Sequence, residues 1–382
     1  TSRNSRLPSL QASASQTFNF GRGLTAENTY ANRNTMNTGL DMSANVPIYT
    51  GGQITHDINM KRLGLDAALA DVSKARESLS IQVTSAYLEV LYQKELWLIA
   101  GRQLELSESQ LERIHRLYES GKAAEAEYAE AQSVVASDQL QLTQRHNSYQ
   151  LALLDLSQVL ERPSPEHFEI ESPEMGSADE TVLDIPDAIY QQAVALRPRI
   201  KSEEIRMKSA EENISLAKSA KLPKLTAMGG LGSNYYKVSG YKSSSFGRQL
   251  KDNFNQYIGV SLSIPIFNRY ANRNQIRTAK AQYTVQQLQL DQAKKDLYKE
   301  IQQAYYNALA AQNQCKSSET AQRASETAFR LMEKKYENGK ANATEYQESR
   351  TKLQKAQSDW AQARYSFFFL KKILDFYQEE AL

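Results

Sequence analysis

The sequence predicts an α+β fold with an internal two-fold repeat, in which short strands are followed by long helices. The first observation is the repeat itself, because the stretch Val46–Tyr49 (VPIY) returns as Ile264–Phe267 (IPIF), 218 residues later (264 − 46). A Tyr-x-x-Gly-Lys-Ala motif at Tyr118 returns at Tyr336 with the same offset. The second observation is that hydrophobicity alternates with period two in four short segments and is helical elsewhere. A duplicated unit buries its apolar faces against its copies, so we expect function in an assembly rather than in one pocket.

Two hairpins, residues 7–48 and 222–266, are predicted to hold the four strands. Each begins with a Leu-Pro-x-Leu motif, at Leu7 and at Leu222. The alternating apolar positions are Leu10, Ala12, Ala14, Phe18 and Phe20; Leu40, Met42, Ala44, Val46 and Ile48; Leu225, Ala227, Gly229 and Leu231; and Ile258, Val260, Leu262, Ile264 and Ile266. Segments of about 9–14 residues are long enough to cross a hydrocarbon layer at a tilt.

The strand pattern leaves two interpretations open. The connections within the hairpins, about Gly21–Asn37 and Lys237–Asn253, are long and polar. Aromatic residues stand near these strand ends, as in the girdle of a membrane barrel: Tyr30, Tyr235, Tyr236, Phe254 and Tyr257. However, an antiparallel sheet packed on helices in a soluble protein alternates in the same way. The pattern alone does not separate these two interpretations.

The rest of the chain is predicted to be mostly helical. Residues 52–160 are expected to form a first helical hairpin, and residues 188–221 and 269–379 the helices of the second half. The long Pro-free arms of about 65 residues would each extend about 100 Å. Gly121 and Gly339 follow the arms as left-handed caps, and a shorter helix returns after each. In the last helix the apolar residues repeat at coiled-coil spacing: Leu353, Ala356, Trp360, Ala363, Phe367, Leu370 and Leu374.

Between the halves, residues 161–187 contain four prolines and are predicted to be a linker or a small irregular side structure. The second half opens with a helical run before Leu222, whereas only six residues precede Leu7. We therefore expect a matching N-terminal helix, and any targeting segment, to be missing from this sequence.

Neither the composition nor the motifs of the sequence indicate an enzyme. The 46 Lys and Arg residues nearly balance the 44 Asp and Glu residues, so no field of one sign points to nucleic acid. The lone Cys315 is interpreted as a structural thiol, and the four histidines (His56, His115, His146 and His167) stand without partners at ligand spacing. The chain has no phosphate loop, dinucleotide fingerprint or nucleophile elbow. We predict no catalytic, cofactor-binding or metal-binding residue, and no cofactor. No window approaches 18 uncharged apolar residues, so no transmembrane helix is predicted.

Four strands cannot close a barrel around a lumen, because small membrane barrels start at about eight strands and lipid does not tolerate open edges. If these strands cross a membrane, several chains must pool them. The doubled unit of strand hairpin and helical hairpin resembles the TolC family of outer-membrane efflux proteins. The resemblance rests on the motifs at Leu7 and Leu222, at Val46 and Ile264, and on Tyr-x-x-Gly-x-x-x-x-x-Glu-Tyr at the helical tips. The motifs Ala361-x-Ala363-Arg364-Tyr365 and Ala195-Leu196-x-Pro198 also match, and the ordered set covers nearly all of residues 1–382 as one protomer.

What the resemblance implies is a membrane protein that is a homotrimer. Four strands from each protomer, twelve in all, would form a shared transmembrane β-barrel in the outer-membrane lipid of a Gram-negative bacterium. A long α-helical coiled-coil barrel would continue it across the periplasm. The trimer would act as the passive exit duct of a tripartite efflux or secretion system. An inner-membrane pump, reached through a periplasmic adaptor protein, would supply the energy.

Two candidate sites follow from the resemblance. The adaptor is expected to dock at the helical tips, which comprise Gly121, Lys122 and Ala123 in the first half and Gly339, Lys340 and Ala341 in the second. The periplasmic gate is expected at acidic residues beyond each tip: Glu345, Glu348 and Glu127. Rings of these carboxylates around a three-fold axis would favour cations. Ala341 stands where some members carry a basic residue, so a salt-bridge lock of that kind is not expected. The alternative from another class is a soluble, elongated coiled-coil scaffold.

Overall fold

The computed structural model describes residues 2–24, 28–162, 170–172 and 182–378. The chain divides into two compact units. Unit 1 comprises Thr1–Leu69 and Ser202–Asp291 and contains the strands, and unit 2 comprises Ala70–Lys201 and Gln292–Leu382. Two helices of 67 residues each, α1 (Gln53–Glu119) and α6 (Ala271–Glu337), run through both units.

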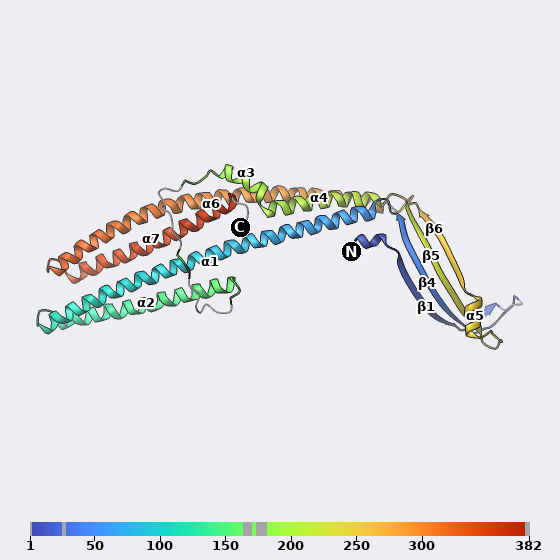
Figure 1. Ribbon diagram of the computed structural model, residues 1–382, viewed down its shortest axis with the longest axis horizontal. Coiled ribbons are helices and arrows are strands. Elements are labelled where there is room, and N and C mark those ends of the chain that lie inside the picture. Colours follow the sequence, from blue (N-terminus) through green and yellow to red (C-terminus); the bar gives the residue numbers. More distant parts are fainter. Residues whose placement is uncertain (1, 25–27, 163–169, 173–181, 379–382) are drawn as a thin grey trace. The chain divides into compact units, whose positions relative to one another are not determined.

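The main sheet of unit 1 is antiparallel and has the order β1-β4-β5-β6. Its strands are β1 (Ser9–Asn19), β4 (Thr35–Tyr49), β5 (Lys224–Val238) and β6 (Asn255–Ser263). The two halves of the repeat therefore lie side by side in one sheet, joined by the pairing of β4 with β5 (Figure 1). Among the described residues, β1 pairs only with β4 and β6 only with β5, so both outer edges of the sheet lack a neighbour.

The register aligns apolar side chains across all four strands on one face. Leu10 pairs with Ala44, Met42 with Leu231, and Ala227 with Val260. Directly opposed residues point to the same face of a sheet, so these pairs form one continuous apolar surface. Several of its members are exposed, including Leu10 at 70% and Val260 at 65%. The alternation that the sequence predicts is thus confirmed, and much of this apolar face is exposed among the described residues.

The connections within the hairpins contain elements that the sequence does not predict. A two-stranded ladder, β2 (Arg22–Leu24) with β3 (Tyr30–Asn32), follows β1, and a short helix, α5 (Phe246–Asp252), precedes β6. A 3₁₀ turn, η1 (Ser2–Arg6), leads into β1. β6 ends at Ser263, earlier than the alternation to Ile266 predicts. Pro265 has no N–H for the ladder, whereas the matching Pro47 is accommodated in β4, next to an irregularity in its register.

In unit 1 the helix α4 (Pro198–Ser219) lies beside α1 and α6. His56 and Glu212 connect α1 and α4, with Nδ1 and Oε2 2.8 Å apart. The Gln286 amide of α6 donates to the Glu203 carboxylate of α4 at 2.8 Å. The single helical run predicted for residues 188–221 is wrong. It is divided into α3 (Pro186–Leu196) and α4, because Pro198 disfavours helical geometry at the preceding Arg197 and is itself suited to a first helical position.

Unit 2 contains two helical hairpins, α1 with α2 (Glu125–Val159) and α6 with α7 (Ala343–Gln378) (Figure 1). Val90 of α1 packs with Leu153 and Leu156 of α2. Cys315 of α6 is buried against Ala363 and Phe367 of α7, which agrees with its interpretation as a structural thiol. Of the predicted linker, residues 163–169 and 173–181 lie outside the described residues. None of the described helices is long and apolar enough to cross a membrane.

α7 buries two faces rather than the single seam that its heptad pattern predicts. Ala363 and Phe367 contact α6, as expected. Ala361 packs against Leu96 and Ile99 of α1, and Tyr365 against Leu88 and Leu91. The small side chain of Ala361 allows the close approach of α1, and together these contacts join the two hairpins of unit 2.

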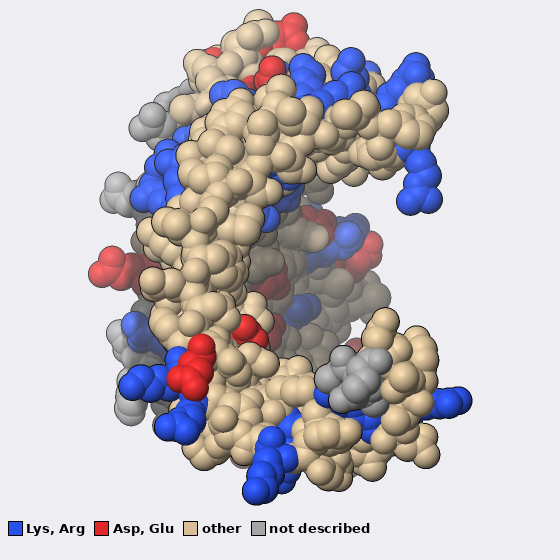
Figure 2. Space-filling model, turned by 90° about the vertical axis from the view of Figure 1, so that its right-hand side faces the viewer, with Lys and Arg blue, Asp and Glu red and all other residues tan. Residues whose placement is uncertain are grey.

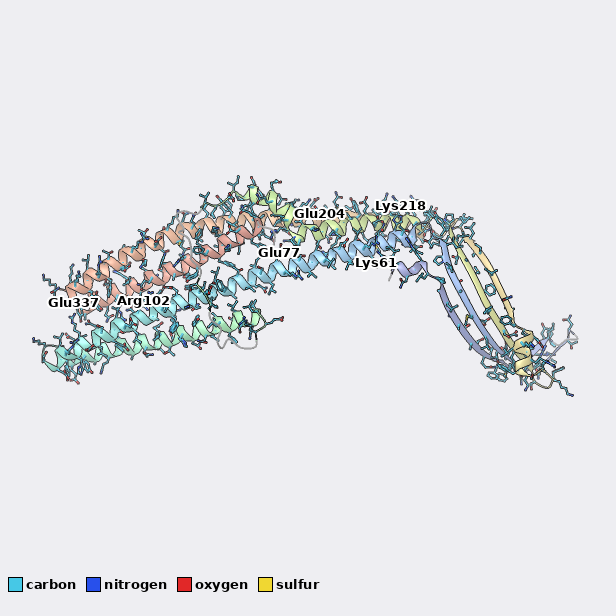
Figure 3. All side chains as sticks on the ribbon, viewed as in Figure 1. Lys61, Glu77, Arg102, Glu204, Lys218 and Glu337 are labelled. Atoms are coloured by element: carbon cyan, nitrogen blue, oxygen red, sulfur yellow. The ribbon has the colours of Figure 1, made fainter. Side chains whose placement is uncertain are left out.

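A buried ion pair lies where α1 passes the break between α3 and α4. The Arg197 guanidinium is 3.1 Å from the carboxylate of Glu77, which Figure 3 labels on α1. Both side chains are at most one-tenth exposed. Burial raises the pKa of the Glu77 carboxyl, and the Arg197 charge opposes that shift. Arg197 also lies over the ring of Phe376, 4.5 Å from its centroid, so the pair links α1 to both the break and α7.

Candidate functional site at the helical tips

Each tip is a tight turn that begins with a left-handed glycine. Gly121 has φ of 73° and Gly339 has φ of 69°, a region in which other residues are strained. The Gly121 N–H donates to the Tyr118 carbonyl and the Lys122 N–H to the Leu117 carbonyl, which is the Schellman pattern. The second tip repeats it with Gly339 and Lys340. The predicted caps are thus confirmed.

The tyrosines of the repeated motif close each turn by stacking. The rings of Tyr118 and Tyr128 are nearly parallel, with centroids 5.4 Å apart. Those of Tyr336 and Tyr346 are 4.8 Å apart. Because each stack joins the outgoing helix to the returning one, it fixes the geometry of the turn. The recurrence of these tyrosines in the sequence has this structural reason, which the motif by itself does not reveal.

The predicted docking residues are at the outer surface of the turns. Gly121, Lys122, Gly339 and Lys340 are exposed, whereas Ala123 and Ala341 are half-buried. Within the described part of the chain, no atom other than those of immediate neighbours lies within 4 Å of where a Cβ on either glycine would be. The tips therefore present small side chains and open space, together with one lysine each.

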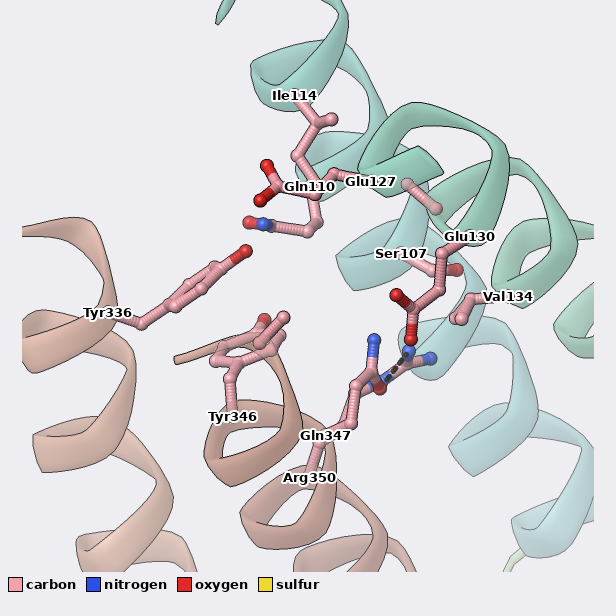
Figure 4. A pocket seen from close by; sticks show the side chains of 12 residues that line it. Ser107, Gln110, Ile114, Glu127, Glu130, Val134, Tyr336, Tyr346, Gln347 and Arg350 are labelled. Carbon is pink, nitrogen blue, oxygen red and sulfur yellow. Dashed lines mark hydrogen bonds between the residues drawn. The ribbon is translucent and has the colours of Figure 1, made fainter. Parts of the chain in front are cut away.

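A pocket opens between the two hairpins just above the tips (Figure 4). Ser107, Gln110 and Ile114 of α1 line one side, and Glu127, Glu130, Ala131 and Val134 of α2 the next. Tyr336 of α6 and Ala343, Tyr346, Gln347 and Arg350 of α7 complete it. The pocket brings the predicted gate residue Glu127 together with both rings of the second tyrosine stack.

The hydroxyl of Tyr336 lies among charged groups in this pocket. Burial raises the pKa of its hydroxyl, and the nearby Glu127 and Glu130 carboxylates raise it further. The Arg113 guanidinium acts in the opposite direction and lies 4.9 Å from the centre of the ring. Tyr336 therefore stays a neutral hydrogen-bond donor at neutral pH.

Glu345 has a structural partner that the sequence interpretation missed. Its carboxylate accepts a hydrogen bond from the Asn342 N–H at 3.0 Å, and its own N–H donates to the Asn342 side-chain oxygen at 2.8 Å. This reciprocal pair is a capping box at the start of α7. The signal was present in the sequence as Asn342-x-x-Glu345, which begins three residues after the tip glycine.

Glu127, the counterpart of Glu345 in the first half, lacks this partner. The preceding cap residue is Ala124, which forms no side-chain capping bond. Glu127 instead lines the pocket opposite Tyr336. The third predicted gate residue, Glu348, is exposed and accepts a hydrogen bond from the Lys352 ammonium at 2.8 Å, which lowers the pKa of its carboxyl. The three carboxylates thus have three different environments.

Arg350 is a site residue that the sequence interpretation did not identify. It is buried at one end of the pocket, where its guanidinium pairs with the Asp138 carboxylate of α2 and donates to the Gln103 carbonyl of α1 at 3.1 Å. A buried arginine satisfied from two other helices holds α7 against α1 and α2. Among the described residues, no group of three or more His, Cys, Asp or Glu side chains could hold a metal ion.

The family model that matches the chain is described as "Outer membrane efflux protein" and covers residues 1–161 and 189–367. The pyoverdine export outer membrane protein OpmQ of Pseudomonas putida is 26% identical over 306 residues, which are 79% of this chain and 62% of the relative. Outer membrane protein TolC of Vibrio cholerae is 22% identical, over 76% of this chain and 65% of the relative. The chain thus matches less than two-thirds of the length of either relative.

Among solved structures, the outer membrane protein VceC from Vibrio cholerae matches with a TM-score of 0.76 and 18% identity. The match covers 99% of this chain and 87% of that one. At this identity, the similarity establishes the fold.

Proposed function

Because the chain belongs to the outer membrane efflux protein family, we propose that three copies of it form a passive exit duct in the outer membrane. The family comprises channels rather than enzymes, and its members reside in the outer membrane. Membership sets aside the alternative of a soluble scaffold. Beyond family membership, we propose the trimer, the shared twelve-stranded barrel and the partners.

The observation that carries the proposal is the sheet, whose apolar face is exposed and whose two outer edges are unpaired among the described residues. In lipid, unpaired backbone groups cost several kcal/mol each, so a membrane sheet must close. Identical neighbours provide the missing edges if β6 of one protomer pairs with β1 of the next. Exposed apolar side chains on α1, among them Leu65, Leu69, Val72 and Leu79, recur at helical spacing and suit contact with another protomer.

The test is oligomeric state together with conductance. The protein, extracted in detergent, is expected to migrate as a trimer on an unheated gel and as a monomer after boiling. In planar bilayers the same preparation is expected to give stable channels. A monomer by light scattering in detergent, without channels, would refute the duct.

We also propose that the exposed tips dock a periplasmic adaptor. Gly121 and Gly339 present no side chain, and the half-buried Ala123 and Ala341 are small, so another helical hairpin can approach closely. Amine-reactive cross-linking in intact cells is expected to capture an adaptor through Lys122 and Lys340. The capture should be lost in Lys122→Gln/Lys340→Gln and retained in Lys280→Gln/Lys299→Gln, a control far from the tips in sequence. Equal capture by both variants would exclude the tips.

The gate proposal assigns Glu127, Glu345 and Glu348 to an anionic constriction. The Glu345 carboxylate is held in the capping box, and the Glu348 carboxyl, whose pKa is lowered, stays charged at neutral pH. Glu345→Ala/Glu348→Ala is expected to weaken cation preference and block by divalent cations in bilayers. Selectivity identical to that of the unmodified protein would remove these residues from the gate.

We assign the selection of the transported cargo and the supply of energy to the partner proteins. We propose that an inner-membrane pump drives export through the adaptor, as the resemblance to the TolC family implies and family membership supports. Pyoverdine, which the name of the Pseudomonas putida relative gives as its cargo, is a suitable first probe of passage. Its failure to pass while ions are conducted would restrict the cargo and leave the duct intact.

A further inference from the structure

We propose that α5 and the adjacent end of β5 form a binding surface for the phosphate groups of membrane lipids. The surface comprises Lys237, Arg248 and Lys251, and we call it the basic collar. The inference rests on the proposed function in one respect, namely that the apolar face of the sheet contacts lipid.

The first step is the position of α5 on the apolar side of the sheet. The Ser233 hydroxyl donates to the Leu250 carbonyl at 2.6 Å, and the rings of Tyr235 and Phe246 meet edge to face at 5.1 Å. Ser233 pairs with Leu40 in the register, so its side chain and that of Tyr235, two residues on, point to the apolar face. α5 therefore covers one end of that face, at the strand ends remote from α1 (Figure 1).

The second step is the charge that α5 brings to this end. Arg248 and Lys251 are three residues apart in the helix and share a side. Lys237 pairs with Met36 in the register, which puts its side chain on the same apolar side of the sheet. All three side chains are exposed, and none forms an ion pair with any residue in the described part of the chain. Between residues 237 and 254 the sequence has one acidic residue, Asp252.

The third step is what lies next to these charges. Phe246 and Phe254 are about half exposed, and Phe254 borders a shallow hollow on the apolar face with Leu40 and Leu231. Apolar residues, then aromatic residues, then cations follow one another toward the strand ends, which is the order of a bilayer from hydrocarbon to phosphate. In Figure 2, Lys and Arg gather at the margins of a largely uncharged surface.

These features favour a lipid phosphate over a soluble anion. Guanidinium and ammonium groups bind phosphate oxygens through charge-assisted hydrogen bonds. A lipid anchored by its acyl chains in the neighbouring hydrocarbon presents its phosphates at the height of the collar and at high effective concentration. A free anion has no contact with the apolar and aromatic part of the surface.

The test compares two variants of the full-length protein that lose the same charge. Lys237→Gln/Arg248→Gln/Lys251→Gln removes the collar, and Lys280→Gln/Lys295→Gln/Lys299→Gln removes three exposed lysines of α6. Binding of lipid A with two phosphates is measured by native mass spectrometry in a neutral detergent. The collar variant should bind at least about tenfold more weakly, because each cation near an anionic surface contributes to attraction, and the α6 variant should bind like the unmodified protein.

Each other outcome has a defined consequence. Equal binding by the collar variant and the unmodified protein would overturn the proposal, as would equal binding of dephosphorylated lipid A. Competition by inorganic phosphate at the same concentration would show recognition of a free anion and overturn the assignment to lipid. Conductance in neutral phosphatidylcholine bilayers is measured on the same preparations. Its loss would count against the duct, whereas its retention with unchanged lipid binding would count against the collar alone.

Discussion

Glu345 and Glu127 stand at the same position of the repeat, six residues after the tip glycine, but their carboxylates have different partners. The reason is one residue at each tip. The Asn342 side-chain oxygen accepts a hydrogen bond from the Glu345 N–H, and the Asn342 N–H donates to the Glu345 carboxylate. Ala124 has no side-chain acceptor for the N–H of Glu127. A substitution of a cap residue thus decides whether the following carboxylate stays at the helix end or lines the pocket.

Exchanging the two cap residues tests this account. Asn342→Ala is expected to destabilise the first turn of α7 by about 1 kcal/mol, because an N-cap side chain is lost. Ala124→Asn is expected to stabilise the start of α2 by a similar amount. Amide hydrogen exchange of the first turns of α2 and α7 measures both effects. Unchanged exchange at α7 in Asn342→Ala would show that the capping box contributes nothing there.

Glu348 offers a test through its titration. The pKa of its carboxyl is lowered chiefly by the hydrogen bond from Lys352, so the folded state binds a proton less readily than the unfolded state does. The associated stability is present above the unfolded pKa, about 4.3, and is lost as pH falls through the lowered folded pKa. Lys352→Gln is expected to return the pKa of Glu348 toward its ordinary value, as measured by NMR of carboxyl-labelled glutamate. An unchanged titration would exclude Lys352 as the cause.

At the tips, sequence reasoning predicted the conformation of the glycines but not the contacts between helices. Gly121 and Gly339 were predicted correctly as left-handed caps. A glycine just after a helix is a local sequence signal, because glycine adopts a positive φ without strain. The stacking of Tyr336 on Tyr346 and the burial of Arg350 were not predicted. Both depend on which helices meet in space, and a local pattern carries no such information.

At the scale of elements, the long helices were predictable and the short ones were not. α1 and α6 were predicted nearly to their ends, since long Pro-free runs leave few alternatives. α5 was missed because its contacts, the Phe246 ring with Tyr235 and the Leu250 carbonyl with the Ser233 hydroxyl, are made to β5, outside the segment. The break at Arg197 was missed although Pro198 indicates it, because the residues on both sides of Pro198 have a composition typical of helices.

The break between α3 and α4 places Arg197 where it can pair with Glu77 of α1. This pair gives a prediction for the stability of unit 2. The buried pair of Arg197 with Glu77 ties the junction of α3 and α4 to α1. Removing one member leaves the other charge buried, which typically costs about 3–5 kcal/mol. Glu77→Ala is therefore expected to lower the free energy of unfolding by about that amount, measured by denaturant titration in detergent.

The exposed pair of Lys355 and Asp359 on α7 is the matched control for this measurement. Both of its side chains are more than half exposed, so Asp359→Ala should change the free energy of unfolding by less than about 1 kcal/mol. Equal losses in Glu77→Ala and Asp359→Ala would mean that burial of the pair on α1 has no energetic consequence.

On the scale of the whole molecule, the repeat brings the two strand hairpins into one sheet whose apolar face is largely exposed among the described residues. Neighbouring strand positions therefore point toward different surroundings. Val260 pairs with Ala227 on the apolar face, and Ser261 pairs with Thr226 on the polar face. Both residues are exposed in the single chain, so the proposed surroundings, lipid on one face and water on the other, are what would distinguish them.

A lysine at each of these adjacent positions makes the distinction measurable. Val260→Lys would point a charge into hydrocarbon, at a cost of about 2–4 kcal/mol in each protomer near the bilayer midplane. Ser261→Lys would point the same charge to the water-filled side and is expected to be tolerated. The amount of heat-sensitive trimer in isolated outer membranes is expected to fall sharply for Val260→Lys alone. If Ser261→Lys were the more damaging change, the polar face would be the one in contact with lipid. If both variants assembled equally well, neither face would lie against hydrocarbon at this depth, and the sheet would not cross the membrane as proposed.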